Sequence, residues 1–315
     1  MTRGLKPFVK WAGGKRDELE IINEFKPTSI NRYIEPFVGG GAVYFDIEAK
    51  SYHINDKSIN LIALYNAIKT GKQEFHETLF MLDGLWCNWT SARDNASIVM
   101  RQHIDDYRLD KIKRLEGKGV FDFSGYEESM VKAGIYNFAR SMMNAQWKSA
   151  SSKAAYYFFV LNYCYGGMNR YNAKGEFNVS YAASYNKKRM DLKYLFNEDL
   201  LNKLDGTVIS NLSYEQIIDG YSDLNQDDFI FIDPPYDSVF KDYEASGFGE
   251  KDQRALGKLL FSLSCKWMVV ISDTPLIREI YGVGARIVEY DKQYKTNINN
   301  SNSKQEVKHL IIMNY

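Results

Sequence analysis

Short runs of apolar and β-branched residues recur along the chain and predict buried strands. They cover residues 33–37, 52–55, 207–210, 229–232, 267–271, 287–290 and 307–313. Continuous apolar runs of this length are typical of strands covered on both faces. Stretches with helical spacing lie between them, at 15–25, at 58–69 with Ser58 as a candidate N-cap, and at 252–263. This alternation predicts an α/β protein with a doubly wound, mostly parallel seven-stranded sheet.

The alternating pattern stops in the middle of the chain. Residues 71–197 are polar, rich in aromatic residues and poor in strand-like runs, so they predict a mainly helical insertion. We therefore expect one domain formed by residues 1–70 and 198–315, interrupted by an inserted domain at 71–197. The total of 315 residues fits this organisation.

The overall charge narrows the possible partners. Lys plus Arg and Asp plus Glu both number 40, which argues against a non-specific coat for DNA but leaves room for a local basic face. Candidates for such a face are Lys148, Lys153, Arg170, Lys174 and the run 187–189, although a solvated surface explains the run equally well.

Cysteine and histidine usage predicts no metal site. The three cysteines are far apart and form no C-x-x-C pair, and the four histidines are scattered. The first residues do not resemble a secretory signal, and no stretch is apolar enough to cross a bilayer. We expect a cytoplasmic protein.

The segment Asp233-Pro234-Pro235-Tyr236 follows the apolar run 229–232, so it lies at the carboxyl end of a predicted strand. Ligands bind at such ends in open α/β sheets. Prolines lack an N–H group, so the segment presents acceptors: a carboxylate and proline carbonyls. Two acceptors can hold the hydrogens of an exocyclic amine and aim its lone pair at an electrophile. Tyr236 offers a ring for stacking on a base.

A glycine-rich segment follows the first predicted strand, and an acidic residue follows the second. The segment 35–41 reads EPFVGGG, and its glycines permit a sharp turn and a close approach to a ligand. It is not G-x-G-x-x-G, so a nucleoside-type cofactor fits better than a dinucleotide. Asp56 is well placed to accept hydrogen bonds from ribose hydroxyls. We assign Glu35, Phe37 and Asp56 to the cofactor site.

The segment 8–15, FVKWAGGK, places a glycine pair and Lys15 before a predicted helix. A helix N-terminus attracts carboxylates, and Lys15 would strengthen that attraction. Each of these segments alone also has a structural explanation: a proline-braced turn, a glycine turn, an N-cap, or a poorly ordered tail. The functional interpretation rests on their combination.

Together the segments resemble the Dam-type, α-group DNA adenine-N6 methyltransferases. FVKWAGGK, EPFVGGGAVYF, HINDKSINLIALYN, NRYNAKGEFNV and DPPY match that family in sequence order and cover nearly the whole chain. The resemblance implies a Rossmann-like methyltransferase fold with an inserted target-recognition domain. It further implies S-adenosylmethionine as cofactor, double-stranded DNA as substrate, base flipping, and neither a metal nor a covalent enzyme intermediate.

The resemblance also assigns roles by position. It implies a cofactor pocket that includes Trp11, Lys15, Asp56, Phe177 and Asp233. The catalytic residues are Asp233, Pro234 and Tyr236. Contacts to DNA are implied for Lys10, for Tyr165 inserted between bases, and for Arg170, whose donors suit guanine in the major groove.

Departures from the family pattern concern the recognition hairpin, residues 161–170. The hairpin before GEFNV is a residue shorter than usual, Gly166 stands where an Asn is common, and the preceding insertion is longer. Relatives of this type commonly methylate adenine in GATC, which is the expected site. The alternatives are an N4-cytosine DNA methyltransferase, a sequence-specific DNA-binding module without catalysis, and a nicotinamide oxidoreductase, the last disfavoured by the missing G-x-G-x-x-G.

Overall fold

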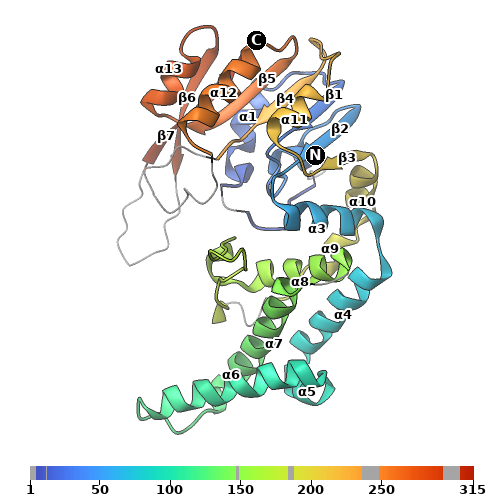
Figure 1. The fold of residues 1–315 in the computed structure, drawn as a ribbon, viewed down its shortest axis with the longest axis vertical. Helices are drawn as coiled ribbons and strands as arrows, with labels where there is room; N and C mark the ends of the chain where they lie inside the picture. Colours follow the sequence, from blue (N-terminus) through green and yellow to red (C-terminus); the bar gives the residue numbers. More distant parts are fainter. Residues whose placement is uncertain (1–4, 12, 147–148, 184–187, 236–247, 294–305) are drawn as a thin grey trace. The chain divides into compact units, whose positions relative to one another are not determined.

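The strands form one seven-stranded sheet in the computed structural model, which describes residues 5–11, 13–146, 149–183, 188–235, 248–293 and 306–315 (Figure 1). The strands are β1 (Arg32–Glu35), β2 (Ser51–Asn55), β3 (Thr207–Ser210), β4 (Phe229–Ile232), β5 (Lys266–Ser272), β6 (Arg286–Gln293) and β7 (Glu306–Met313). Their order is β3-β2-β1-β4-β5-β7-β6. Only β7 runs antiparallel to its neighbours, β5 and β6. The predicted mostly parallel sheet is therefore confirmed.

One boundary of the predicted strands is wrong. The first apolar run was expected to be extended through Phe37, but β1 ends at Glu35. Pro36 has no N–H group for the ladder, so the strand gives way to the loop that follows.

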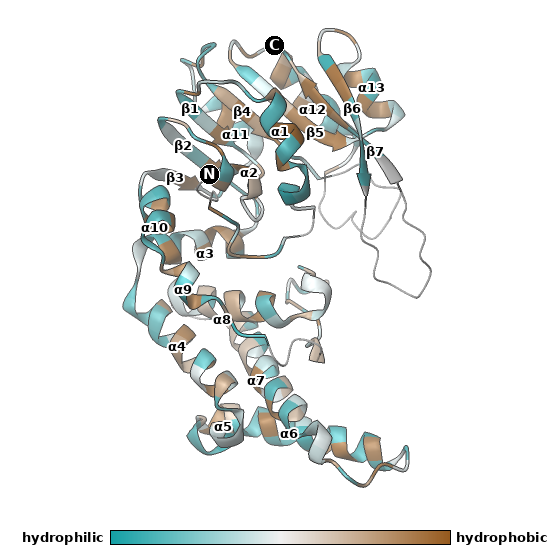
Figure 2. Ribbon diagram, turned by 180° about the vertical axis from the view of Figure 1, so that it is seen from behind, coloured by the Kyte–Doolittle hydropathy of each residue, from teal (hydrophilic) through white to brown (hydrophobic). Residues whose placement is uncertain are grey.

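Helices cover both faces of this sheet. On one face, α11 (Tyr214–Asp219), α12 (Glu250–Phe261) and α13 (Pro275–Tyr281) pack on a core that includes Ile230, Ile232 and Trp267. On the other face are α1 (Leu19–Phe25) and α2 (Ala42–Asp46), which lie in front of the strands in Figure 2. There Phe229 contacts the ring of Tyr315, whose hydroxyl donates to the carbonyl of Phe25. This two-sided cover explains why all four residues of β4 are buried and why its sequence lacks a polar alternation.

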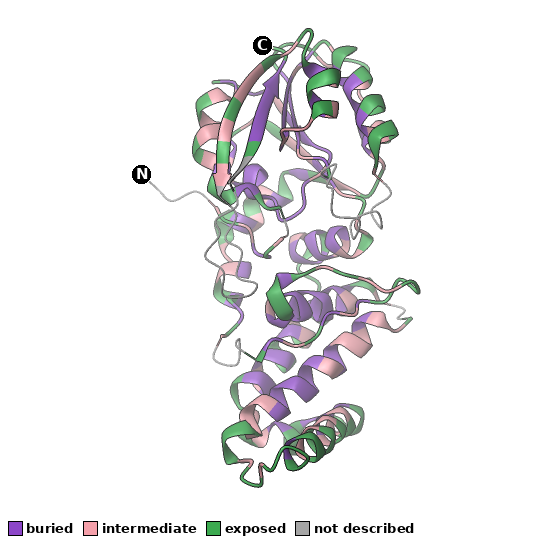
Figure 3. Cartoon of the chain, turned by 90° about the vertical axis from the view of Figure 1, so that its left-hand side faces the viewer, coloured by how far each residue is buried: buried purple, intermediate pink, exposed green. Residues whose placement is uncertain are grey.

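The second compact unit is helical. It contains α3 (Ile59–Thr70), α4 (Gln73–Cys87), α5 (Trp89–Asn95), α6 (Ile98–Glu116), α7 (Glu127–Asn144), α8 (Ala150–Tyr163), α9 (Leu192–Leu195) and α10 (Glu198–Asp205). Ser58 caps α3 by accepting from the N–H of Leu61, as its sequence predicts. Helices α7 and α8 form the buried centre, whereas α6 is largely exposed (Figure 3). The expected mainly helical insertion is present.

The compact units divide the chain at different positions from those expected. The helical unit comprises Met1–Gly14 and Ser58–Asp205, and the α/β unit comprises Lys15–Lys57 and Gly206–Tyr315. Residues 58–70 thus group with the helices, because Tyr65 of α3 packs against Phe8 and α3 also packs on α8. The assignment of cofactor binding to one domain and DNA recognition to the other stays a prediction. No helix in the described part of the chain is long and apolar enough to span a membrane.

Gly134 lets α6 and α7 approach closely, and its replacement should destabilise the helical unit. A Cβ atom at Gly134 would lie 2.4 Å from the Cα of Ile104, so the two backbones would have to separate. We expect Gly134→Ala to lower the free energy of unfolding by about 1–3 kcal/mol, measured by urea denaturation. Gly84→Ala on α4 is the matched control, because nothing lies within 4 Å of its added methyl. Equal stabilities for the two variants would contradict the argument.

Candidate active site

The predicted catalytic and cofactor segments of the α/β unit follow the adjacent strands β1, β2 and β4. The strand order reverses between β1 and β4, because the chain proceeds from β1 to β2 on one side and from β4 to β5 on the other. This is the topological switch point at which open α/β sheets bind ligands, outside the carboxyl ends of the strands. The loops after Glu35, Asn55 and Ile232 therefore border one site.

The glycine-rich loop is bound to the end of β2. The N–H of Val38 donates to the carbonyl of Asn55 at 2.9 Å, and the N–H of Gly39 donates to Asp56 Oδ2 at 3.0 Å. Gly39 and Gly41 have φ angles of 49° and 76°, a left-handed conformation that side chains disfavour. One oxygen of Asp56 thus orients this loop, and the carboxylate is half-buried at the edge of the sheet where ligands bind.

Asn55, the last residue of β2, binds the loops that follow β1 and β3, and it was missed by sequence reasoning. Its Nδ2 donates to the carbonyls of Pro36 and Leu212, each at 3.0 Å. Its Oδ1 accepts from Ser210 Oγ and from the N–H of Leu212, each at 2.8 Å. An amide at the end of a buried strand was the available signal. Asn55 acts as a support for the loops rather than as a surface that meets a ligand, because it is 1% exposed.

Asp233 is paired with Lys15. Lys15 Nζ donates to Asp233 Oδ1 at 2.6 Å, and the lysine side chain is 2% exposed. Burial raises the pKa of Asp233, and the charge and hydrogen bond of Lys15 oppose that rise. Sequence reasoning placed Lys15 at the start of an α-helix, but residues Lys15–Glu18 form a 3-10 turn before α1. The pairing thus joins two predicted site residues that are far apart in sequence.

A buried polar cluster adjoins this pair and was not foreseen. Lys292 Nζ lies 2.6 Å from Glu18 Oε2, His309 Nδ1 lies 3.3 Å from Glu18 Oε1, and the hydroxyl of Tyr290 donates to the same carboxylate. Burial alone would raise the pKa of Glu18, but the bonds to His309 and Lys292 and the charge of Lys15 bring it to about 2. Glu18 is therefore ionised, and its charge faces Lys15.

Glu35 is a buried carboxyl at the end of β1. It is 2% exposed and accepts a hydrogen bond from the hydroxyl of Tyr33 at 2.7 Å. Burial raises the pKa of Glu35 well above its usual value, and Asp233 and Asp56 add to the rise. A cationic ligand group at this position would offset that burial cost.

The helical unit holds the other predicted residues. Lys10 is exposed, Trp11 is half-buried, and the segment before them is anchored by Phe8, whose ring meets Tyr65 edge-on at 4.9 Å. A Cβ atom built on Gly167 would lie 3.7 Å from the Cβ of Lys10. The structure thus brings Lys10 next to Gly167 of the recognition segment, residues 161–179, although the two residues are far apart along the chain and share no helix.

The recognition segment presents Tyr165 and Arg170 to solvent. Tyr165 is 55% exposed and follows α8, and Arg170 is also exposed. Arg170 Nε donates to Asn178 Oδ1 at 2.9 Å, and the N–H of Asn178 donates to the carbonyl of Arg170 at 3.1 Å. These bonds restrain Arg170 at its Nε atom and at its backbone carbonyl, while the residue as a whole is exposed.

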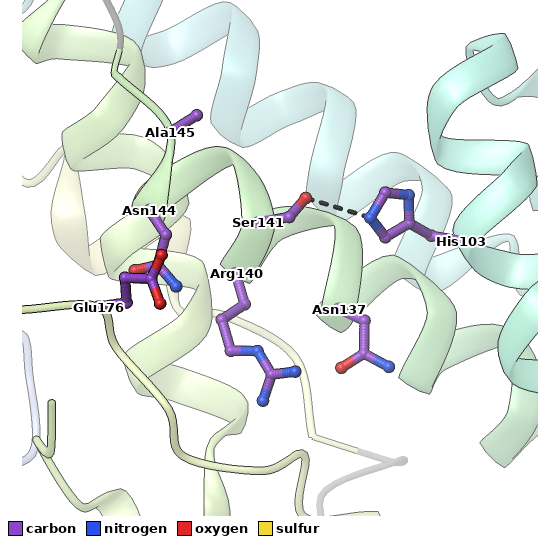
Figure 4. Close-up of a pocket in the computed structure, with 7 residues that line it drawn as sticks. All are labelled: His103, Asn137, Arg140, Ser141, Asn144, Ala145 and Glu176. Atoms are coloured by element: carbon purple, nitrogen blue, oxygen red, sulfur yellow. Dashed lines mark hydrogen bonds between the residues drawn. The ribbon is translucent and has the colours of Figure 1, made fainter. Parts of the chain in front are cut away.

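Side chains of α7 bind the backbone of the recognition segment at Phe177 and Val179. Asn144 Nδ2 donates to the carbonyl of Phe177 at 3.0 Å, and Asn144 Oδ1 accepts from the N–H of Phe177 at 2.8 Å. Arg140 and Tyr136 both donate to the carbonyl of Val179. Beside these contacts lies a pocket of about 580 Å³ (Figure 4), lined by His103, Asn137, Arg140, Ser141, Asn144, Ala145 and Glu176. The side chains of α7 thus make the hydrogen bonds to the backbone of this segment that a neighbouring strand would otherwise make.

The remaining predictions differ in how the structure bears on them. Phe177 is 1% exposed and its ring meets that of Tyr171 edge-on at 5.7 Å, so little of it is accessible. Pro234 is buried next to Asp233. Tyr236, and Lys148 and Lys187 of the suggested basic face, lie outside the described residues. The roles of all these residues stay predictions.

The fold and the switch-point loops define a Rossmann-like methyltransferase. The family model for D12 class N6 adenine-specific DNA methyltransferases matches residues 11–296. The chain belongs to this family, and it is an adenine-specific DNA methyltransferase.

Individual relatives resemble the chain over almost its full length. The chain is 29% identical to the type II methyltransferase M.CviBI of Paramecium bursaria Chlorella virus NC1A, over 99% of this chain and 100% of the relative. It is 29% identical to the type II methyltransferase M.MjaIII of Methanocaldococcus jannaschii, over 99% of each chain. It is 27% identical to a DNA adenine methylase of Haemophilus influenzae, over 97% of this chain and 92% of the relative.

Proposed function

We propose that the protein transfers a methyl group from S-adenosylmethionine to the N6 amine of adenine within a specific short duplex DNA sequence, with GATC as the expected site. The observation that carries this proposal is the acceptor loop Asp233–Pro235 at the switch point, with Lys15 bound to Asp233 at 2.6 Å. The names of relatives that are DNA adenine methylases support the choice of adenine.

The acceptor loop explains how a weak nucleophile is activated. The lone pair of an exocyclic amine is conjugated with the ring, and hydrogen bonds from its N–H groups to two acceptors orient it for attack. Asp233 supplies the carboxylate acceptor, and the carbonyl of Pro234 supplies the second. Since neither proline donates, no N–H of the prolines competes with the amine for these acceptors. Lys15 opposes the rise in the pKa of Asp233 that burial causes, which favours the ionised, accepting form of the carboxyl.

The residues at the switch point fit the proposed cofactor. S-adenosylmethionine, when bound, supplies an electrophilic methyl group on a sulfonium. Asp56 would hold the ribose hydroxyls, and the glycine loop would allow close approach of the nucleoside. Glu35, a buried carboxyl that Tyr33 already bonds, fits an ammonium group. We also assign Trp11, Lys15, Phe37 and Phe177 to cofactor binding, as the sequence predicts.

Recognition of DNA is assigned to the helical unit. Arg170 would read a guanine with its outer N–H groups, since arginine suits the O6 and N7 acceptors of that base. Tyr165 would insert between bases, and Lys10 would contact the DNA near the target. Extrusion of the adenine costs a few kcal/mol, and stacking on Tyr236 would offset part of that cost.

Product analysis tests the proposal directly. Purified protein is incubated with labelled S-adenosylmethionine and unmethylated duplexes with or without GATC, and the digested nucleosides are separated. Label in N6-methyladenine only from GATC duplexes is expected. Label in N6-methyladenine from both duplexes would reject GATC as the recognition site but keep the reaction. Label in N4-methylcytosine would reject adenine as the target base. No label from folded protein would favour a DNA-binding module without catalysis.

Asp56 gives a prediction that isolates cofactor binding. We expect Asp56→Ala to weaken S-adenosylmethionine binding by about 10- to 100-fold, because a charged acceptor is lost from the ribose and from the N–H of Gly39. Asp56→Asn keeps an acceptor oxygen and should lose less. Isothermal titration with S-adenosylhomocysteine measures both. Unchanged affinity in Asp56→Ala would remove this residue from the cofactor site.

A further inference from the structure

A buried glutamine on α12 contacts the acceptor loop. Gln253 is 1% exposed, and its Nε2 donates to the carbonyl of Pro235 at 3.0 Å. Its Oε1 is buried and has no hydrogen-bond partner among the described residues. Burial of an amide costs free energy unless its polar atoms form hydrogen bonds. The bond from Gln253 to the acceptor loop is therefore the feature that explains a glutamine at this position.

The start of α12 is anchored to the glycine-rich loop as well. Phe248, just before the helix, meets the ring of Phe37 edge-on at 5.7 Å, and Tyr214 packs on both rings at 5.6 and 5.8 Å. Phe37 belongs to the cofactor segment that follows β1. The cofactor loop is therefore contacted by Phe248, which precedes α12, and the acceptor loop by Gln253 in the first turn of α12.

We propose that Gln253 is a positioning residue, which fixes the Pro235 carbonyl and so holds the acceptor loop at a set distance from the cofactor loop. This inference rests on the proposed function, because Asp233 and Pro234 must bind the amine for their position to matter. Consecutive prolines have no N–H groups with which to bind the loop to the sheet. A side-chain donor from outside the loop supplies the missing restraint. Gln253 itself need not touch either substrate.

Two substitutions at this position separate positioning from packing. Gln253→Met keeps the length and apolar volume but removes the donor. A small displacement of the reacting groups lowers the reaction rate strongly, so we expect the single-turnover rate of Gln253→Met to fall by about 10- to 100-fold. Binding of S-adenosylhomocysteine should stay within about threefold, because the loss concerns the transition state. Gln102→Met, at an exposed glutamine on α6, is the matched control and should behave as the wild type.

Gln253→Glu provides a pH signature that a packing role would not produce. Above the pKa of the new carboxyl it carries no proton and repels the Pro235 carbonyl. Below that pKa it donates as the amide does. Burial raises a carboxyl pKa toward neutrality, so the rate relative to wild type should rise as the pH is lowered from 9 to 6 by about tenfold. Gln102→Glu, the control, should show a flat ratio.

The outcomes separate this inference from the proposed function. Wild-type methylation of adenine with a Gln253→Met rate equal to wild type would overturn the inference alone. A flat pH ratio for Gln253→Glu would do the same, because it would reduce Gln253 to packing. Absence of any adenine methylation by the wild type would reject the proposed function, and the inference with it.

Discussion

Replacing Asp233 with alanine should abolish most methyl transfer and leave the fold intact. The variant loses the charged acceptor for the amine, and removal of one such preorganised group typically costs about 10²- to 10³-fold in rate. The measurement is the single-turnover rate of transfer from labelled S-adenosylmethionine at saturating DNA. Asp233→Asn keeps an oxygen acceptor but not the charge, so its rate should lie between those of alanine and wild type.

Lys15 complicates this test, because Asp233→Ala leaves the ammonium of Lys15 without its partner at 2.6 Å. Thermal unfolding must therefore be recorded for each variant, so that a rate is compared only among folded proteins. Asp219→Ala, at an exposed aspartate ending α11, is the matched control. A folded Asp233→Ala variant with near-normal turnover would refute the assigned role.

Replacing Lys15 with methionine should move the pH dependence of the reaction upward. Burial raises the pKa of Asp233 and Lys15 opposes that rise. Without the lysine the protonated carboxyl is favoured further, and a protonated Asp233 has less capacity to accept from the amine. The acid limb of the rate profile should therefore shift to higher pH by about one to three units. At pH values below the acid limb of the wild type this shift corresponds to a rate about 10- to 1000-fold lower than that of the wild type, and alkaline pH recovers the loss.

The single-turnover rate between pH 5.5 and 9.5 checks this expectation. Lys50→Met removes an exposed lysine of the same unit and should leave the profile unchanged. A Lys15→Met variant with a lower rate but an unmoved acid limb would show that Lys15 acts on the cofactor alone and not through Asp233.

Local patterns in the sequence determined the elements of the sheet and the identity of its loops. The run Phe229–Ile232 reads as a doubly covered strand because each of its residues must be apolar when helices pack on both faces. Asp233 and the glycines after Glu35 could then be placed at strand ends without any long-range information. Ser58 was also readable, because an N-cap acts within its own helical turn.

Contacts between distant segments were decided only by the tertiary structure. Nothing in the local sequence around these residues indicates their partners. The cases are the bond from Lys15 to Asp233, the four bonds made by the side chain of Asn55, and the bond from Gln253 to Pro235. The same is true of Asn144 and Phe177 in the helical unit.

The physical reason is that the interactions behind these two kinds of feature act over different distances along the chain. Hydrophobic periodicity and capping act over a few residues and are written in the order of the chain. A buried hydrogen bond or ion pair depends on which strands become neighbours, and that order is set by packing of the whole sheet. The sequence by itself determined the family, the strands and the acceptor loop. The tertiary structure decided which side chains orient that loop and set the charge of its aspartate.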